Sequence, residues 1–384
     1  MLSREIVLEA EIRNVEYTPT MVNKDILPEY SFEEFQRGEV TSGNFLLKME
    51  DQCLAISRWV SPKRTRSYPF ARIYDTLNYK NRLTVIPLVK DEGIGGERDY
   101  LQWDTVSLMS LLRVYVIIAY YASAEPHPKR KYQGKKITNQ EFDYNYLTEK
   151  IKQFLHYQSD ALHWNLNQMD NLQKIAKMCE QKYYEEISSE LGVPMHSREY
   201  FKRKIEKIIA DSEQFKQTSR KQAREAQSRE VQTIQPKEQL ITNSKAVLTI
   251  RNFLGGAYYF TTDECLINQD KIFLIEKKHT KRQLPSINDI KDGILKMVLF
   301  SNLDNVRGKK KEFKSTAILG LTAKKFPGIW TSWGVEDYES ENLTNRNREI
   351  LEKLKEEARV NGFYVFVLNS KLHKKQNELL KSLI

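Results

Sequence analysis

The segment TTDECLINQDKIFLIEKKHT, residues 261–280, predicts a strand hairpin in the C-terminal part of the chain. Its apolar run KIFLI ends at Glu276, which two lysines follow. Successive side chains of a strand point to opposite faces, so Glu276 and Lys278 would share one face. We expect the preceding strand to end at Asp263 and to pair with this strand as a hairpin through ECLINQDK, residues 264–271. Asp263 would then lie beside Glu276 and Lys278.

Two carboxylates and a lysine in one pocket indicate metal-assisted chemistry on a phosphate. Carboxylates that lie close together repel, and a hard divalent cation such as Mg²⁺ relieves that repulsion through oxygen ligands. The cation would also neutralise charge that develops on a phosphate, while Lys278 would position or activate the attacking water. The alternative is structural: Glu276 and Lys278 form a solvated ion pair at the end of a strand, worth roughly a few tenths of a kcal/mol.

The sequence around this stretch predicts a mixed sheet covered by helices. Strands are expected at residues 257–262, 271–277, 315–323 and 363–368, and helices at 287–303 and 341–361. The strands are almost wholly apolar, as in sheets that are buried on both faces, and Gly362 is a fitting stop signal for the second helix. The expected order is therefore strand, strand, helix, strand, helix, strand.

Asp263, Glu276 and Lys278 form the pattern D-x12-E-x-K within this strand, strand, helix, strand order. The sequence thereby resembles the PD-(D/E)XK nuclease superfamily, most closely its type II restriction endonucleases. The resemblance covers about residues 244–384 and implies a restriction-endonuclease-like core. It also implies that Asp263 and Glu276 bind Mg²⁺ together with the main-chain carbonyl of Lys277. Lys278 would be the catalytic lysine.

The activity that this resemblance implies is Mg²⁺-dependent hydrolysis of phosphodiester bonds in double-stranded DNA at a specific short sequence. One active site per chain must cut two antiparallel strands, so we expect a homodimer. A cognate DNA methyltransferase in the same system is implied by the resemblance alone. The alternatives are a repair or structure-directed nuclease of the same superfamily, and a non-catalytic DNA-binding protein.

The N-terminal region, residues 1–140, is expected to be α/β and to pack on the nuclease core. Strands are predicted within residues 82–90 and 114–122 from their β-branched and aromatic content. Between them, residues 104–112 have the apolar pattern of a helix that faces a sheet, with Asp104 as the expected N-cap.

The middle region, residues 141–240, is expected to be helical, and the nuclease core then occupies residues 241–384. The last part of the helical region, residues 214–236, has almost no apolar period, so it is either a solvated helix or a flexible connector. The expected fold class is thus α/β, with a mixed central sheet flanked by helices and a helical middle region.

Basic side chains are expected at two places on the DNA-binding surface. Residues 185–208 have the outline of a helix-turn-helix, whose second helix would present Arg198, Lys202 and Arg203. The alternative is two ordinary helices with solvated basic side chains. The run RGKKKEFK would neutralise backbone phosphates through a further cluster: Lys309, Lys310 and Lys311.

The Gly-rich loop at residues 90–99 gathers four carboxylates: Asp91, Glu92, Glu97 and Asp99. One of them would be available as an extra acid for a catalytic pocket, but no E-x-K lysine accompanies them. An acidic loop that caps the following helix is the plainer interpretation. The glycine spacing does not match a phosphate-binding loop.

The composition agrees with a folded protein that binds a polyanion. A formal charge of +10 favours nucleic acid as a partner, although a basic proteome explains the charge equally well. The three cysteines are far apart, which predicts neither a disulfide framework nor a zinc site and favours a reducing compartment. The longest apolar runs are too short to span a membrane, so we expect a cytoplasmic protein with no membrane partner.

Overall fold

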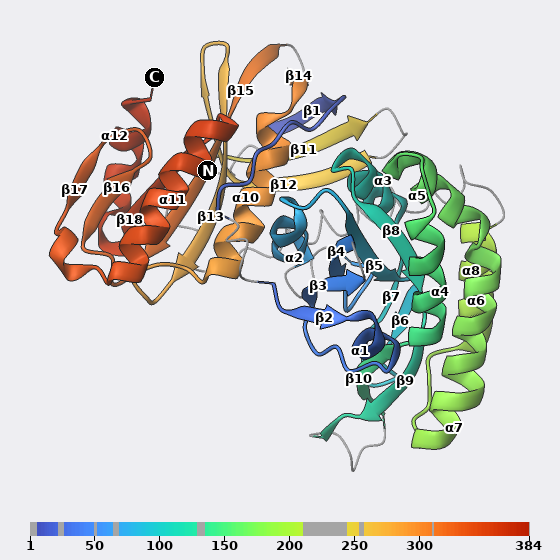
Figure 1. Cartoon of the computed structure of the whole chain (residues 1–384). Coiled ribbons are helices and arrows are strands. Elements are labelled where there is room, and N and C mark those ends of the chain that lie inside the picture. Colours follow the sequence, from blue (N-terminus) through green and yellow to red (C-terminus); the bar gives the residue numbers. More distant parts are fainter. Residues whose placement is uncertain are drawn as a thin grey trace. The chain divides into compact units, whose positions relative to one another are not determined.

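The computed structural model describes residues 6–21, 27–49, 52–63, 69–128, 135–209, 244–252, 257–308 and 311–383 (Figure 1). Contacts group the chain into two compact units. One unit, called here the motif unit, combines Met1–Asn23 with Ala223–Ile384, and the other, the middle unit, is Lys24–Gln222. This division differs from the three regions expected from the sequence, because the start of the chain groups with the C-terminal region.

The motif unit is built on a mixed nine-stranded sheet. Its strands are β1 (Ile6–Ile12), β11 (Ser244–Asn252), β12 (Ala257–Asn268), β13 (Lys271–Thr280), β14 (Asp304–Arg307), β15 (Glu312–Ala323), β16 (Gly328–Thr331), β17 (Glu336–Tyr338) and β18 (Tyr364–Asn369). Their order is β13-β12-β11-β1-β14-β15-β18-β16-β17, and β13 also pairs with β15. The pairings of β13, β12, β11, β1, β14 and β15 therefore form a closed circuit.

The strands expected in the C-terminal region are all present. β12 and β13 form an antiparallel hairpin, and β13, β15 and β18 run parallel to one another. β1 was not predicted; it pairs in parallel with β11, with Ile6 opposite Ala246. The alternating residues Leu8, Ala10 and Ile12 of β1 are buried, so the start of the chain completes the core of this unit.

Helices lie against both faces of this sheet: α10 (Ile287–Ser301), α11 (Asn345–Asn361) and α12 (Gln376–Lys381), with the short turns η3 (Ser340–Asn342) and η4 (Ser370–Lys375). α10 packs on β13 and β15, on the face that carries Lys278 and Leu319. α12 packs on the opposite face, where Phe273 and Ile275 belong to its core cluster. The expected mixed sheet flanked by helices is confirmed. α11 ends, as expected, at Gly362, whose φ of 68° is left-handed.

The middle unit contains a five-stranded sheet of order β2-β3-β4-β5-β8. Its elements are β2 (Glu29–Ser31), α1 (Phe32–Gln36), β3 (Asn44–Met49), β4 (Gln52–Arg58), α2 (Pro69–Thr76), β5 (Arg82–Pro87), β6 (Val89–Asp91), β7 (Arg98–Tyr100), α3 (Trp103–Leu111), β8 (Tyr115–Ala119), β9 (Tyr121–Pro126) and β10 (Ile137–Phe142). The expected strand, helix, strand unit is confirmed as β5, α3 and β8, with β5 parallel to β8. The N-cap prediction was wrong, because Gln102 and not Asp104 is the N-cap of α3.

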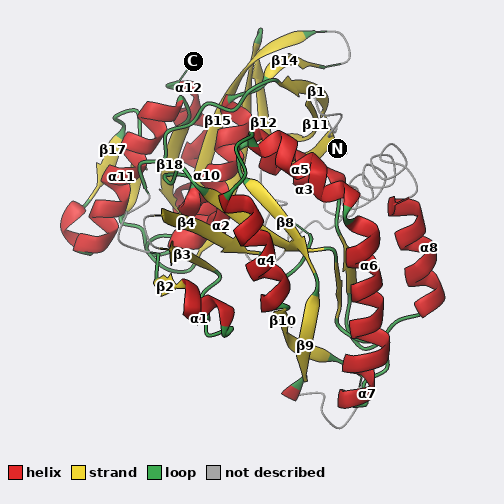
Figure 2. Cartoon of the chain, turned by 45° about the vertical axis from the view of Figure 1, so that its right-hand side comes forward, coloured by secondary structure: helices red, strands yellow, loops and turns green. Residues whose placement is uncertain are grey.

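The expected helical region is confirmed between Tyr144 and Ile209, whereas the residues just before it belong to β10 (Figure 2). Its helices are α4 (Tyr144–Leu155), α5 (Ala161–Asp170), α6 (Leu172–Gln181), the π-helix η2 (Lys182–Ile187), α7 (Ser188–Leu191) and α8 (Arg198–Ile209). The segment 214–236, expected to be a helix or a connector, lies outside the described residues. Among the described helices, none is long and apolar enough to cross a membrane.

Candidate active site

The β12–β13 hairpin brings Asp263 close to the end of the apolar run in β13. The two strands pair from Asn268 and Lys271 at the turn up to Glu264 and Ile275. One more step in this register would place Asp263 opposite Glu276. At that point the backbone N–H of Lys277 donates to Asp263 Oδ2 at 2.6 Å, so the Asp263 carboxylate bridges the two strands.

A register shift between β11 and β12 accompanies Asp263. Ala246 lies opposite Thr262, whereas Ser244 lies opposite Cys265, so β12 has one extra residue at this position. Such β-bulges change the direction in which a side chain points and are frequent beside active sites. The expectation that a strand ends at Asp263 was wrong, since β12 continues beyond it as the hairpin strand.

Glu276 is at the centre of a row of alternating charges. Its side chain is buried, and its Oε1 is 2.7 Å from Nζ of Lys296 and 3.2 Å from Nζ of Lys278. Lys278 Nζ in turn donates to Asp292 Oδ2 at 2.9 Å. The row Lys296, Glu276, Lys278, Asp292 takes two members from β13 and two from α10, where residues four apart share one face. The buried pair is not the solvated ion pair of the structural alternative.

The charges of this row hold one another ionised. Burial alone would raise the pKa of Glu276, but the positive charges of Lys296 and Lys278 outweigh burial, and the pKa lies below its ordinary value. Burial alone would lower the pKa of Lys278, but Glu276 and Asp292 raise it above the ordinary value. The pKa of Lys296 is also raised, because Glu276 and Asp263 outweigh its burial. Asp263 thus acts on the same ammonium group as Glu276.

The oxygen atoms of this site are suited to Mg²⁺. Oε2 of Glu276 is buried, and among the described residues no group donates a hydrogen bond to it. Leaving a buried carboxylate oxygen without a donor is costly, and a cation would remove that cost. The described residues contain no cluster of three or more His, Cys, Asp or Glu side chains arranged for a metal. Two carboxylates and a carbonyl would be enough protein ligands for Mg²⁺, because this cation usually keeps several water ligands.

The side chain of Lys277 belongs to the opposite face of the sheet. Its Nζ forms an ion pair with Glu264, and Gln376 of α12 donates to the other oxygen of the same carboxylate. Lys277 is therefore held away from Glu276, and only its main chain is near the motif. The expected role of its carbonyl stays a prediction.

Sequence reasoning did not find Asp292 and Lys296. Both residues come from α10, which begins at the N-cap Ser286. The one signal in the sequence was a lysine inside the apolar run ILKMVLF, where a charged side chain needs a partner.

The expected helix-turn-helix outline is present in the middle unit. η2 and α7 end at Gly192, which has a left-handed φ of 61°. α8 follows the turn, and the Oγ of Ser197 accepts a hydrogen bond from the backbone N–H of Tyr200 at its start. Figure 2 shows α6 and α8 as neighbouring helices, and they pack on one another.

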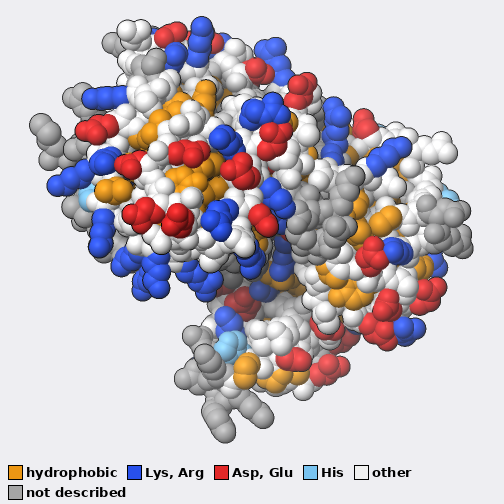
Figure 3. Space-filling model, turned by 60° about the vertical axis from the view of Figure 1, so that its left-hand side comes forward, with side chains coloured by type: hydrophobic (Ala, Val, Ile, Leu, Met, Phe, Trp, Pro, Cys, Tyr) orange, Lys and Arg blue, Asp and Glu red, His pale blue; other side chains and the backbone are white. Residues whose placement is uncertain are grey.

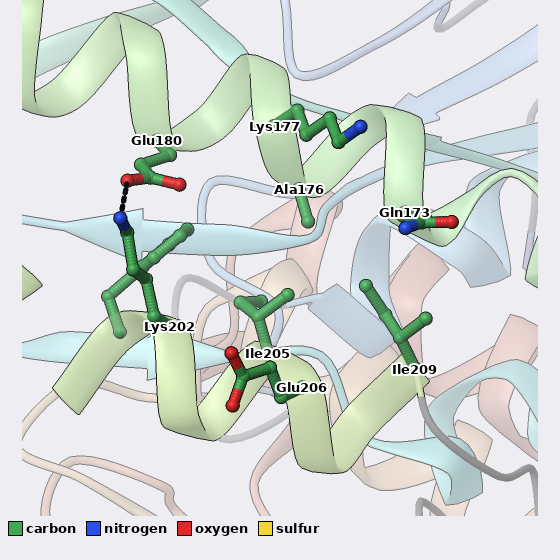
Figure 4. A pocket seen from close by; sticks show the side chains of 9 residues that line it. Gln173, Ala176, Lys177, Glu180, Lys202, Ile205, Glu206 and Ile209 are labelled. Atoms are coloured by element: carbon green, nitrogen blue, oxygen red, sulfur yellow. Dashed lines mark ion pairs between the residues drawn. The ribbon is translucent and has the colours of Figure 1, made fainter. Parts of the chain in front are cut away.

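Of the three basic residues of α8 that are expected to contact DNA, two form ion pairs within the middle unit. Arg198 lies 2.6 Å from Glu180 and 2.7 Å from Glu185, and Lys202 lies 3.2 Å from Glu180. Arg203 is exposed. The pairs with Glu180 hold α8 against α6, and the Glu180–Lys202 pair borders a pocket of about 390 Å³ (Figure 4). The pocket is lined by Gln173, Ala176, Lys177, Glu180, Phe201, Lys202, Ile205, Glu206 and Ile209. DNA contact by these residues stays a prediction.

The second basic cluster is described only in part. Lys309 and Lys310 lie outside the described residues. Lys311 Nζ donates to the main-chain carbonyl of Gln269, in the turn of the β12–β13 hairpin, at 2.6 Å. Basic side chains are interspersed with acidic ones on the face that Figure 3 draws.

The acidic loop of the middle unit has basic partners of its own. Glu92 lies 2.9 Å from both Lys90 and Lys136, and Asp99 lies 2.6 Å from Lys63. These pairs agree with a structural role for the loop.

Comparisons of the chain with protein-family models, with curated proteins and with solved structures give no match.

Proposed function

We propose that the chain is a Mg²⁺-dependent nuclease of the PD-(D/E)XK type that acts as a type II restriction endonuclease on double-stranded DNA. One observation supports this most strongly: buried Glu276 has an oxygen without a hydrogen-bond donor among the described residues, and Lys278 and Asp263 lie beside it. The order β12, β13, α10, β15, with the short strand β14 inserted before β15, also agrees with the strand, strand, helix, strand order that accompanies the motif. A restriction-endonuclease-like core belongs to the same proposal.

Each residue of the site has a distinct role in this proposal. Asp263 and Glu276 would hold the cation with the main-chain carbonyl of Lys277. Bound Mg²⁺ would supply a Lewis acid that neutralises charge developing on the phosphodiester. Lys278 is held protonated by Glu276 and Asp292, because its raised pKa opposes loss of the proton. Beside the bound cation it would position or activate the attacking water.

The expected partners follow from the chemistry of duplex cleavage. A homodimer on a two-fold symmetric site would place one active site on each DNA strand. A cognate DNA methyltransferase in the same system would protect host DNA. Arg203 and the lysines at residues 309–311 would contribute salt-sensitive phosphate contacts.

Incubation of the purified protein with phage DNA, with and without Mg²⁺, tests the proposal. We expect discrete fragments that appear only with Mg²⁺, and a loss of about 100-fold or more in rate for Lys278→Ala. Discrete fragments separate a restriction enzyme from a repair or structure-directed nuclease, which would not produce a fixed pattern. DNA that is bound but stays intact in the presence of Mg²⁺ would refute nuclease activity and favour a non-catalytic DNA-binding protein.

A further inference from the structure

Building on the nuclease function proposed above, we propose that Lys296 is a positioning residue that makes the site selective for Mg²⁺ over Ca²⁺. Lys296 occupies one oxygen of Glu276, so that this carboxylate offers a cation one oxygen and not two. The E-x-K motif does not include Lys296, which comes from α10.

The two oxygens of Glu276 have different surroundings. Oε1 accepts a hydrogen bond from Lys296 Nζ at 2.7 Å and lies 3.2 Å from Lys278 Nζ. Oε2 is buried and receives no hydrogen bond from the residues that the structure describes. Two ammonium groups on one oxygen therefore leave the other oxygen as the atom available to a cation.

The fold holds Lys296 firmly in this place. Its side chain is largely buried, with 18% exposed, and α10 packs closely on the sheet beneath it. A Cβ at Gly293, one turn before Lys296, would lie 2.7 Å from Cδ1 of Leu319 on β15, so a larger residue there would force the buried Leu319 side chain to shift. A buried ammonium on a closely packed helix has little freedom to leave its carboxylate.

Mg²⁺ and Ca²⁺ place different demands on a carboxylate. Mg²⁺ requires nearly ideal octahedral geometry, and it usually takes one or two carboxylates while it keeps several waters. Ca²⁺ takes a larger, more flexible set of ligands and often binds both oxygens of one carboxylate. Because Lys296 already occupies Oε1, Glu276 can bind Mg²⁺ through one oxygen but cannot bind Ca²⁺ through both.

Calorimetric titration of the full chain with Mg²⁺ and, separately, with Ca²⁺, in the absence of DNA, tests this role. For Lys296→Met we expect the ratio of Ca²⁺ affinity to Mg²⁺ affinity to rise about tenfold. Changes of this size in metal affinity are typical when a hydrogen-bond partner of a metal ligand is replaced. Lys296→Arg, which keeps a cationic donor, should leave the ratio within about threefold of the wild type. An unchanged ratio in Lys296→Met would overturn the inference.

Val298→Ala is the matched control, because it weakens the packing of the same helix without removing a charge. It should preserve the ratio; a change equal to that of Lys296→Met would mean that general loosening of α10 is the cause, and would refute a specific role for Lys296.

If Lys296→Met does not fold, Lys296→Gln removes the charge while keeping a polar group, and it should shift the ratio in the same direction. A wild-type chain that binds neither cation and leaves DNA intact would refute the proposed function itself. A wild type that cleaves DNA while the Lys296 variants keep its ratio would refute this inference alone.

Discussion

Replacement of Glu357 by glutamine should remove a pH dependence of stability from the motif unit. Glu357 is a fully buried residue of α11, and its carboxylate holds the N-terminal segment of the chain. Its Oε2 accepts hydrogen bonds from the backbone N–H groups of Thr20 at 2.6 Å and Met21 at 3.0 Å, and from the hydroxyl of Thr20. These contacts tie the start of the chain to the C-terminal region.

The size of the effect follows from the pKa of this carboxyl group. Burial raises the pKa of Glu357 from 4.5 to about 7, against the opposing effect of the backbone donors of Thr20 and Met21. Since each pKa unit corresponds to about 1.4 kcal/mol, the folded state loses about 3 kcal/mol when the group must ionise. The folded pKa is the higher one, so this stability is fully present below about pH 4.5 and is lost as the pH rises through about 7.

Urea denaturation of the wild type and of Glu357→Gln, at about pH 5 and about pH 8, measures the effect. The wild type should lose about 2.5 kcal/mol more than the variant between these pH values, because glutamine does not titrate. Glu92 and Glu276 do not interfere, because their pKa values are lowered from 4.5 in the folded state. The stability that depends on these two groups therefore changes below the pH range of the measurement. Equal pH dependence of the two proteins would refute the reasoning.

Three further substitutions test other parts of the structure. Gly362→Ala should lower the free energy of unfolding by about 1 kcal/mol in urea denaturation, because the residue is left-handed and its Cβ would contact nothing within 4 Å. An unchanged free energy of unfolding would contradict the role of Gly362 in ending α11. Glu264→Ala leaves the largely buried Lys277 without its ion-pair partner and should cost about 3 kcal/mol by the same method, whereas a neutral effect would mean that the pair is solvated. Asp292→Asn loosens the hold on Lys278 and should slow DNA cleavage about tenfold at unchanged melting temperature; an unaltered rate would exclude a role for Asp292 in positioning Lys278.

The arrangement of Asp263, Glu276 and Lys278 was largely predictable because it depends on local geometry. Residues two apart on one strand share a face, and a short hairpin fixes which residues of its strands face each other. The bulge at Asp263 was not predictable, since it arises from the pairing of β12 with β11 and not from the hairpin.

The contribution of α10 and of the first strand depends on contacts between distant parts of the chain. A helix face can be found from its apolar period, but which strand residue each helix residue meets depends on how the helix packs. In the sequence, Lys296 was therefore recognisable only as a charged residue within an apolar run, without an identified partner. β1 pairs with β11 across more than 200 residues of chain, and neither strand contains a signal for the other.

The proposed nuclease activity requires Asp263 and Glu276 to hold one divalent cation together. Anomalous diffraction from crystals of the full chain soaked with Mn²⁺, a substitute for Mg²⁺ with a usable signal, tests it most directly. We predict one peak that contacts a carboxylate oxygen of each residue, with Oε2 as the ligand from Glu276. A peak at another site, or none beside these two carboxylates in crystals of a chain that cleaves DNA with Mn²⁺, would refute a cation site shared by Asp263 and Glu276.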